Sequence, residues 1–393
     1  MAALGFRSGR DRDKGNRKGG SRRRRHPVTD AGRRNAAYLT AVVAGLTLFG
    51  LVMVLSASAP GSLHDFGDSP LGQFKKQATW AAIGTLAFVV TSRLDYRLFR
   101  PLAKPLLLVT LAMLVAVLVP GIGRNINGSS RWLGLGPVVI QPGEVAKLVV
   151  VIFFADLLAA RERRMDRPEL TVRPVMLLLG LVSALLLAQP KLGTPIIMGA
   201  TTIILLFVAG AKVRHLLPWA TVAVAGATAA ALVGYRMDRL LAFLDPWSDP
   251  QGIGLQSIQS QVSIASGGLF GLGLGYSRAK WGFLPYPFTD FIFAIVAEEV
   301  GLIGASALIC GFLFIGWFGL RAAMYAPDRF GTLLAAGLTC WLLVQAFLNI
   351  GMVLGVAPIT GEPLPFVSAG GSSLVTALAA AGLLASVSRR AKV

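Results

Sequence analysis

WGFLPYPFTDFIFAIVAEEVGLIG, residues 281–304, begins as a loop rich in aromatic residues and proline and continues as an apolar helix. At 3.6 residues per turn, one narrow helix face carries Asp290, Ala294, Ala297, Gly301 and Gly304. Such a stripe of small residues most simply lets another helix pack closely in a membrane, although it could also leave room for a lipid chain. Asp290, at the junction of loop and helix, is a candidate functional residue, because an ionisable group at a membrane boundary is costly.

The composition identifies a polytopic membrane protein and excludes a soluble domain. The chain of 393 residues is 54% hydrophobic and 15% charged, with a mean hydropathy of +0.65. Its two cysteines, Cys310 and Cys340, lie in apolar segments, and its 3 histidines are scattered. The sequence therefore predicts neither a disulfide framework nor a metal site.

Ten apolar runs predict an all-α bundle of ten transmembrane helices. They lie near residues 36–57, 78–92, 102–120, 144–160, 174–189, 195–210, 215–235, 289–319, 331–354 and 367–387. The second and sixth runs are short for a hydrocarbon core of roughly 30 Å, so their ends are the least well defined. An even number of spans places both termini on one side of the membrane.

The charge distribution indicates which side this is. The net charge is +19, and residues 1–35 form a basic, Gly-rich tail that is expected to be disordered. If the tail is cytoplasmic, 28 of the 38 Lys and Arg residues lie in cytoplasmic segments, including the short tail 389–393. The positive-inside rule thus predicts that both termini are cytoplasmic. Beside a membrane helix, a basic tail is better explained by anionic lipid than by nucleic acid, so no nucleic-acid partner is predicted.

With this topology, polar groups from several segments gather at the outer face. GSSRWLGLGPVVIQPGEVAK, residues 128–147, ends in Glu144 and Lys147 at the helical spacing i, i+3. Glu144 could simply complement the positive end of its helix, with Lys147 as its ion-pair partner. Helices do not need buried ion pairs, so we favour a functional role in which Lys147, with Arg131 or Arg124, holds an anionic group such as a pyrophosphate.

The long loop 236–288 lies between the seventh and eighth spans on the same face. It is too polar and Gly-rich to be a span and too apolar to be a free linker. Residues 256–265 predict a short amphipathic helix on the membrane surface. The glycine runs of the loop do not match a phosphate-binding loop.

The end of the ninth span and the start of the tenth contribute further polar groups. Gln345 and Asn349 are spaced i, i+4, and hydrogen bonds between helices are their simplest explanation. SAGGSS, residues 368–373, places Ser372 where a hydroxyl could contact a lipid headgroup. All three side chains are candidates for substrate binding.

Four stretches together resemble the SEDS family, the proteins of shape, elongation, division and sporulation. They are TDFIFAIVAEEVGLIG, LDPWSDPQGIGLQSIQS, GSSRWLGLG followed by QPGEVAK, and NIGMVLGVAPITGEPLPFVSAGGSS. The resemblance runs from Tyr38 to Arg389. DPW, SRAKW and SAGGSS are more similar to the division members of the family, FtsW, than to the elongation members, RodA.

The resemblance implies a ten-helix SEDS bundle over residues 36–388, with a cavity open to the outer leaflet. It implies a peptidoglycan glycosyltransferase that polymerises lipid II, an undecaprenyl-pyrophosphate-linked disaccharide pentapeptide, at the outer face of the bacterial cytoplasmic membrane during cell division. The implied partners are a class B penicillin-binding protein, which is an FtsI-like transpeptidase, and other divisome proteins at the septum. A role for Mg²⁺ or Mn²⁺ stays open, and no metal ligands are predicted.

The resemblance also implies roles for individual residues. The family's essential aspartate matches Asp290, which would act as the general base that takes the proton from the acceptor sugar's 4-hydroxyl. A single carboxylate base suggests one displacement with inversion. The expected substrate-binding residues are Glu144, Lys147, Arg131, Arg124, Gln345, Asn349 and Ser372.

Several departures from the family pattern surround these residues. The family usually reads LPEAHTDF where this chain reads LPYPFTDF, so Tyr286 and Phe288 replace a glutamate and a histidine. QPSE becomes QPGE, with Gly143, and QPDLGT becomes QPKLGT, with Lys191 in place of an aspartate. An active protein is still expected, because Asp290 and its matched partners remain.

Three alternative functions are kept. A RodA-type elongation polymerase would use the same chemistry. A lipid II flippase or transporter would fit buried charges such as Glu298, Glu299 and Asp156, but transport sites lie near the bilayer midplane and the candidates here cluster at the outer face. At least one of Glu298 and Glu299 should face the bundle interior in any case. A divisome scaffold with little activity of its own would fit the departures near Asp290.

Overall fold

The computed structural model describes residues 30–59, 71–126, 129–135, 138–232, 235–285 and 287–391. Residues 1–29, which hold most of the tail that is expected to be disordered, and Tyr286 lie outside these ranges.

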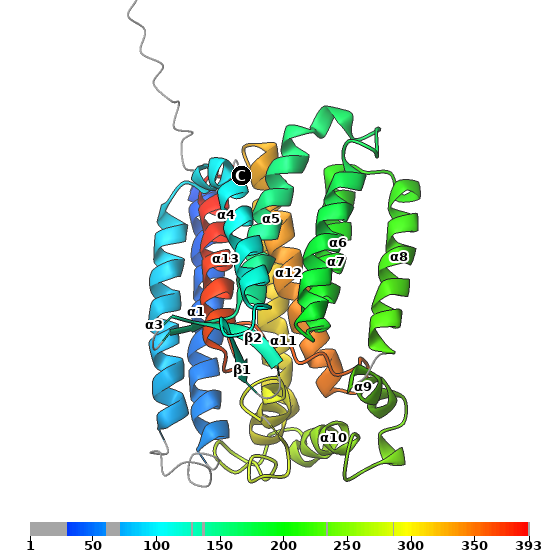
Figure 1. Ribbon diagram of the computed structural model, residues 1–393. Coiled ribbons are helices and arrows are strands. Elements are labelled where there is room, and N and C mark those ends of the chain that lie inside the picture. The colour runs from blue at the N-terminus through cyan, green and yellow to red at the C-terminus, as the bar shows by residue number, and fades with distance from the viewer. Residues whose placement is uncertain are drawn as a thin grey trace, which may run out of the picture.

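Long helices that run side by side form the body of the molecule (Figure 1). In the described ranges, the helices of 17 or more residues are α1 (Asp30–Ser58), α3 (Gly72–Arg93), α4 (Phe99–Ala116), α5 (Pro142–Ala160), α6 (Val172–Ala188), α7 (Gly193–Ala209), α8 (Val213–Ala231), α11 (Ile292–Met324), α12 (Arg329–Val353) and α13 (Gly371–Arg389). Each coincides, within a few residues, with one predicted apolar run, and the helical bundle is confirmed. Five of them (α1, α4 with the turn before it, α11, α12 and α13) are long and apolar enough to cross a membrane. The count of ten spans stays a prediction.

The ends of these helices follow local sequence rules. Pro142 occupies the first turn of α5, where a missing backbone N–H costs nothing. Asp328 caps α12, because its carboxylate accepts a hydrogen bond of 2.9 Å from the Gly331 N–H. Gly210 ends α7 in the left-handed conformation with φ 99°, which glycine adopts without strain.

The bundle is much more enclosed on one side than on the other. α13 is buried along most of its length and packs against α3, where Cβ atoms built at Gly371 and Gly382 would collide with Trp80 and with the backbone of Phe88. α8 lies at the opposite edge (Figure 1), and in its described residues only Leu216 is buried. The edge formed by α8 is therefore left to lipid or to a partner.

Shorter elements lie away from the C-terminus, two helices at the opposite end of the molecule and a small sheet nearer its middle (Figure 1). An antiparallel sheet in the order β1-β2-β3 connects α4 to α5, with strands β1 (Gly123–Ile126), β2 (Ser129–Leu135) and β3 (Val138–Ile140). The sequence analysis did not predict this sheet. Helices α9 (Tyr235–Leu244) and α10 (Leu255–Gly267) follow α8, and α10 confirms the short helix predicted at residues 256–265.

The predicted stripe of small residues after Asp290 requires one continuous helix. In the structure, the helix is interrupted. Gly301 interrupts α11 with φ 70° and ψ −170°. The segment 268–273 replaces the lost helical hydrogen bonds: Leu302 and Ile303 donate their N–H groups to Gly268 and Leu269, at 2.9 and 3.3 Å. The stripe is therefore broken between Gly301 and Gly304. Its small residues admit another backbone at close range, since a Cβ at Gly267 would lie 2.0 Å from the Ala297 carbonyl oxygen.

Candidate functional site

Four charged side chains form a closed ring of ion pairs in the protein interior. Lys147 Nζ lies 2.9 Å from Glu144 Oε2 and 3.1 Å from Glu362 Oε2. Lys191 Nζ lies 2.9 Å from Glu144 Oε1 and 3.3 Å from Glu362 Oε1. Each of the four side chains is at most 5% exposed. We call these four residues the charged ring.

Three connections between helices bring the charged ring together. Glu144 and Lys147 lie in the first two turns of α5, Lys191 lies between α6 and α7, and Glu362 lies between α12 and α13. The α6–α7 and α12–α13 connections approach so closely that a Cβ at Gly193 would lie 2.5 Å from Glu362 Cγ. The ring therefore joins segments that are far apart in the sequence.

Hydrogen bonds from α12 fix the position of Lys147. Gln345 Oε1 accepts one hydrogen bond of 2.8 Å from Lys147 Nζ and another of 2.9 Å from Trp341 Nε1. The amide nitrogen of Gln345 donates to the Pro363 carbonyl at 2.8 Å, next to the ring residue Glu362. The structure thus gives Gln345 a positioning role between Lys147 and the α12–α13 connection, as expected of a buried amide in a membrane bundle.

The formal charges of the ring cancel, and each buried charge lies beside two charges of the opposite sign. Burial alone would lower the pKa of Lys191, but Glu144 and Glu362 together raise that pKa above its usual range. An ammonium group this deeply buried is stable only while both carboxylates remain. The ring is therefore a rigid, neutral support and does not present a free positive charge.

Asp290 lies in the turn before α11 and beside the α12–α13 connection. Asn349 links the two segments, because its amide nitrogen donates to the Asp290 carbonyl at 2.8 Å and to the Glu362 carbonyl at 2.7 Å. The hydroxyl of Thr289 donates to Asp290 Oδ1 at 2.6 Å. Burial is the main cause that raises the pKa of the Asp290 carboxyl above its usual range, and this suits a group that must accept a proton.

A cavity lined by three basic side chains adjoins Asp290 and the charged ring. Arg131, Lys191 and Arg239 line it, together with apolar and backbone groups. Gly361 lies near both Asp290 and the lining residue Arg239: a Cβ built there would be 3.8 Å from Asp290 Oδ2 and 3.3 Å from Arg239 Nη1, and its φ is +66°. Glycine at this position keeps the carboxylate and the guanidinium close to each other. We call this the basic cavity.

The other predicted site residues occupy different places. Arg131 lines the basic cavity and donates to the Gln189 and Pro190 carbonyls at 2.9 and 2.6 Å. Arg124 lies on β1 with its side chain against Gly134, and nothing in the described residues places it at the charged ring. Ser372 is buried, and its hydroxyl accepts a hydrogen bond of 3.0 Å from the backbone N–H of Gln141, just before α5.

Glu298 and Glu299 form a second buried polar cluster, near the break in α11. Both side chains are buried, as was expected of at least one of them. Glu298 accepts a hydrogen bond of 2.5 Å from the Ser277 hydroxyl, and Glu299 pairs with Lys280 Nζ at 2.8 Å and with the Ser56 hydroxyl at 2.7 Å. The two carboxylates therefore hold the segment 277–280 against α11.

The donor groups do not fit a divalent cation. In the described ranges no three His, Cys, Asp or Glu side chains are grouped so that they could hold a metal ion. The carboxylates of the charged ring, Glu144 and Glu362, are each bound by two ammonium groups. We therefore assign no step to Mg²⁺ or Mn²⁺.

Sequence reasoning missed Glu362 and Arg239. Glu362 stands among prolines in a connection with no helical spacing to interpret, and its partners Lys147 and Lys191 are 215 and 171 positions away in the chain. Arg239 looked like an ordinary basic residue of the long loop. The one available signal was Lys191, because a new lysine among buried residues requires a carboxylate.

Comparison with known proteins places the chain in a family. Residues 36–393 match the family model of FtsW, RodA and SpoVE, described as cell cycle protein. The stage V sporulation protein E of Bacillus subtilis is 40% identical over 88% of this chain and 94% of its own length. A probable peptidoglycan glycosyltransferase FtsW of Mycobacterium tuberculosis is 43% identical over 89% of this chain and 67% of its own length.

Solved structures agree with the sequence comparisons. The rod shape determining protein RodA of Thermus thermophilus is 30% identical, with a TM-score of 0.63 over 90% of this chain and 97% of that chain. A chain described under "Structural coordination of polymerization and crosslinking by a peptidoglycan synthase complex" is 33% identical, with a TM-score of 0.74 and the same coverage. This chain therefore belongs to the FtsW, RodA and SpoVE family of cell cycle proteins, which is the SEDS family.

Proposed function

We propose that this chain is a peptidoglycan glycosyltransferase that extends glycan strands from lipid II at the outer face of the cytoplasmic membrane. The observation that carries the proposal is the position of Asp290 beside the basic cavity, in a chain 38 to 43% identical to relatives named probable peptidoglycan glycosyltransferase FtsW. A carboxylate base and basic groups for a diphosphate are the two functions that this polymerisation needs.

The chemistry assigned to Asp290 is proton transfer. Its carboxylate accepts the proton of the acceptor sugar's 4-hydroxyl while that oxygen attacks the anomeric carbon of the donor. The bond between the anomeric carbon and the diphosphate oxygen breaks, and undecaprenyl pyrophosphate leaves. A single displacement of this kind inverts the configuration at the anomeric carbon.

The groups that stabilise the leaving diphosphate are Arg131 and Arg239, which line the basic cavity. From the sequence this role is predicted for Lys147 with Arg131 or Arg124, but Lys147 is 1% exposed and held by two carboxylates, so we assign the role to Arg131 and Arg239. Positive groups that are fixed before the reaction stabilise the charge that develops on the leaving oxygen. Glu144, Lys147, Gln345 and Asn349 act as positioning residues around them.

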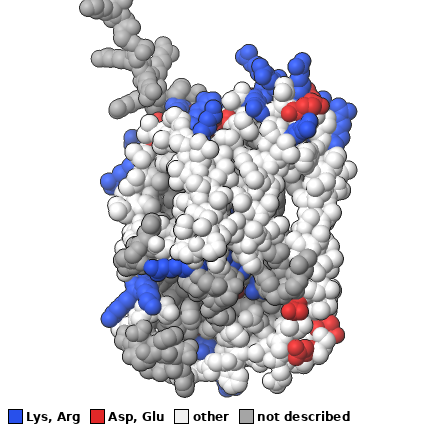
Figure 2. Space-filling view, viewed as in Figure 1, with Lys and Arg blue, Asp and Glu red and all other residues white. Residues whose placement is uncertain are grey.

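The orientation and the partners follow from the same proposal. Lys and Arg side chains gather at the end of the molecule that carries the C-terminus (Figure 2), which supports cytoplasmic termini and an outward-facing Asp290. The likeness to a chain of a peptidoglycan synthase complex supports a class B penicillin-binding protein as partner. The identity to FtsW relatives supports a place at the division septum, in preference to the elongation role of RodA.

The structure gives less support to a flippase. The buried carboxylates Glu298 and Glu299 do lie beside a broken helix, as transport sites often do. Their oxygens are nevertheless bound by the segment 277–280 and by Ser56, so they are arranged as structural groups.

The test is polymerisation of labelled lipid II by the purified protein, with and without its penicillin-binding partner, read as glycan ladders on a gel. Wild type should give ladders, and Asp290→Ala and Asp290→Asn should lower the rate by at least about 100-fold, the usual contribution of a general base. Asp238→Asn, an exposed aspartate on α9, is the matched control and should polymerise normally.

Near-normal ladders from either Asp290 variant would refute the assignment of the base. If wild type gives no ladder but moves labelled lipid II across vesicle membranes, the protein would be a flippase and the proposal of a polymerase would be wrong. If neither polymerisation nor lipid movement is observed with the partner bound, the protein would be a scaffold.

A further inference from the structure

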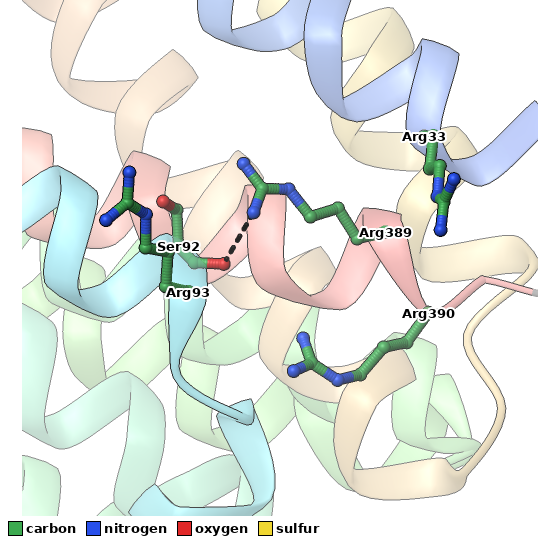
Figure 3. Close-up of a pocket in the computed structure, with 5 residues that line it drawn as sticks. All are labelled: Arg33, Ser92, Arg93, Arg389 and Arg390. Carbon is green, nitrogen blue, oxygen red and sulfur yellow. Dashed lines mark hydrogen bonds between the residues drawn. The ribbon is translucent and has the colours of Figure 1, made fainter. Parts of the chain in front are cut away.

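A second charged cavity lies at the end of the molecule that carries the C-terminus, away from the site described above. It has a volume of about 360 Å³ and is lined by Arg33 of α1, Ser92 and Arg93 of α3, and Arg389 and Arg390 at the end of α13. Figure 3 shows these side chains around the hollow between the three helix ends. We call it the arginine pocket.

The lining holds four guanidinium groups and no carboxylate. The nearest paired carboxylate is Asp95, whose Oδ2 lies 3.6 Å from Arg390 Nε. Arg389 Nη1 donates to the Ser92 carbonyl, at 3.4 Å (Figure 3). A guanidinium does not lose its proton at any relevant pH, so an anion bound in the pocket would relieve the mutual repulsion that remains after the ion pair with Asp95.

The position of the arginine pocket matches the depth of lipid headgroups. Arg93 and Arg389 are the last residues of α3 and α13, and Arg33 lies in the first turn of α1. Exposed apolar side chains stand about one turn farther into the bundle, with Val90 on α3 46% exposed and Tyr38 on α1 57% exposed. Acyl chains can therefore cover the helix surface directly below the guanidinium groups.

We propose that the arginine pocket binds the phosphate group of an anionic phospholipid in the leaflet that meets the C-terminal end of the molecule. Arginine suits this ligand, because its planar guanidinium forms paired hydrogen bonds with phosphate oxygens. The adjoining apolar surface favours a phosphodiester that carries acyl chains over a free phosphate ion. The bound lipid holds together the ends of α1, α3 and α13, which otherwise repel one another.

The test uses the full chain, purified in a neutral detergent and titrated with phosphatidylglycerol, with bound lipid counted by native mass spectrometry. Arg33→Gln together with Arg93→Gln removes the two exposed lining charges, whose side chains have no recorded partner among the described residues. Each basic group near an anionic headgroup contributes about fivefold in binding, so the double variant should bind the first lipid about 25-fold more weakly.

The matched control is Arg163→Gln together with Arg164→Gln, which removes two exposed arginines between α5 and α6, outside the pocket. It should bind phosphatidylglycerol as wild type does. Phosphatidylglycerol should raise the Tm of wild type and of this control, but not that of the pocket variant. Without lipid, the pocket variant should be at least as stable as wild type, because a repulsion has been removed, and this also shows that it folds.

Three results would overturn the proposal. The pocket variant could bind phosphatidylglycerol as tightly as wild type. Phosphatidylcholine could bind equally well, which would mean that the anionic charge is not recognised. Inorganic phosphate could by itself raise the Tm of wild type and displace phosphatidylglycerol, which would make the pocket a site for a free ion.

Discussion

Lys147 and Lys191 share the same two carboxylates. A change in the charge of any one of these four residues therefore disturbs the whole charged ring. Each ammonium group lies within 3.3 Å of both Glu144 and Glu362, and none of the four side chains is more than 5% exposed. Taking charges out of water is costly, and the cost is recovered only when every charge keeps its partner. Replacing either lysine by a neutral residue therefore leaves two buried carboxylates with only one ammonium group as partner.

Lys191 offers the sharpest test, because the SEDS motif that QPKLGT resembles has an aspartate at this position. Lys191→Met should destabilise the protein by about 3 to 5 kcal/mol, the cost of breaking a buried ion pair. Lys191→Asp should be worse, although it restores the family residue, because it places three carboxylates around Lys147. Lys191→Arg keeps the charge and serves as the control. Thermal unfolding in detergent measures all three, and an Asp variant as stable as wild type would contradict the ring.

At this scale, some members of the candidate site could be proposed from the sequence and others could not. Asp290, Glu144 and Lys147 could be predicted because their motifs carry them at fixed local spacings. Glu362 could not, since its ion pairs join connections that meet only after the bundle has folded. Arg124 stays a predicted substrate-binding residue, and its side chain lies against Gly134 of the sheet.

At the scale of the elements, the shape of α11 depends on hydrogen bonds from a segment outside the helix. Its residues before Gly301 lead from Asp290 into the core, and its residues after Gly301 form an apolar span. The segment 268–273 runs beside the break and exchanges backbone hydrogen bonds with residues on both sides of it. Glu298 and Glu299 hold the neighbouring segment 277–280 in the same place. The break thus positions the loop that ends at Asp290.

Gly301→Ala should disrupt this arrangement. Gly301 has φ 70° and ψ −170°, a conformation that costs residues with a side chain about 1 to 3 kcal/mol. The added Cβ would also lie 2.3 Å from the Gly271 backbone nitrogen. We expect a lower Tm in detergent and weaker polymerisation. Gly45→Ala is the control: it lies in α1 with no atom within 4 Å of the built Cβ and should be neutral or stabilising. Equal Tm values for the two variants would contradict a structural role for the break.

The helices were predictable because each needs a long apolar run and little else. α3, for example, was predicted at residues 78–92 and is observed at Gly72–Arg93, where the polar first turn hid the true start. The break in α11 was not predictable, since the hydrogen bonds that replace those of the helix come from residues 268 and 269, which are distant in the sequence. The sheet was hidden for a similar reason: its strands are short, and they are stabilised by pairing with one another.

At the scale of the whole molecule, the two ends differ in charge and in structure. The end with the C-terminus carries the arginine pocket, the α5–α6 connection and a dense set of Lys and Arg side chains (Figure 2). The opposite end carries α9 and α10 (Figure 1), and Arg239 of α9 and Asp290 both lie within 4 Å of a Cβ built at Gly361. Positive charge is retained on the cytoplasmic side during insertion. Asp290 and the basic cavity should therefore face outward, where lipid II is polymerised.

Single cysteines at the two ends test this orientation. Cys310, which is exposed, and Cys340 are first replaced by Ala to give a background without thiols. Gln251→Cys, between α9 and α10, should react with a membrane-impermeant maleimide on intact cells. Arg163→Cys, between α5 and α6, should react only after the membrane is opened, because its thiol would then face the cytoplasm. The reverse pattern would place Asp290 on the cytoplasmic side. The proposed base and a substrate in the outer leaflet would then lie on opposite sides of the membrane. Asp290 could not take a proton from the acceptor sugar, and the proposed mechanism would be wrong.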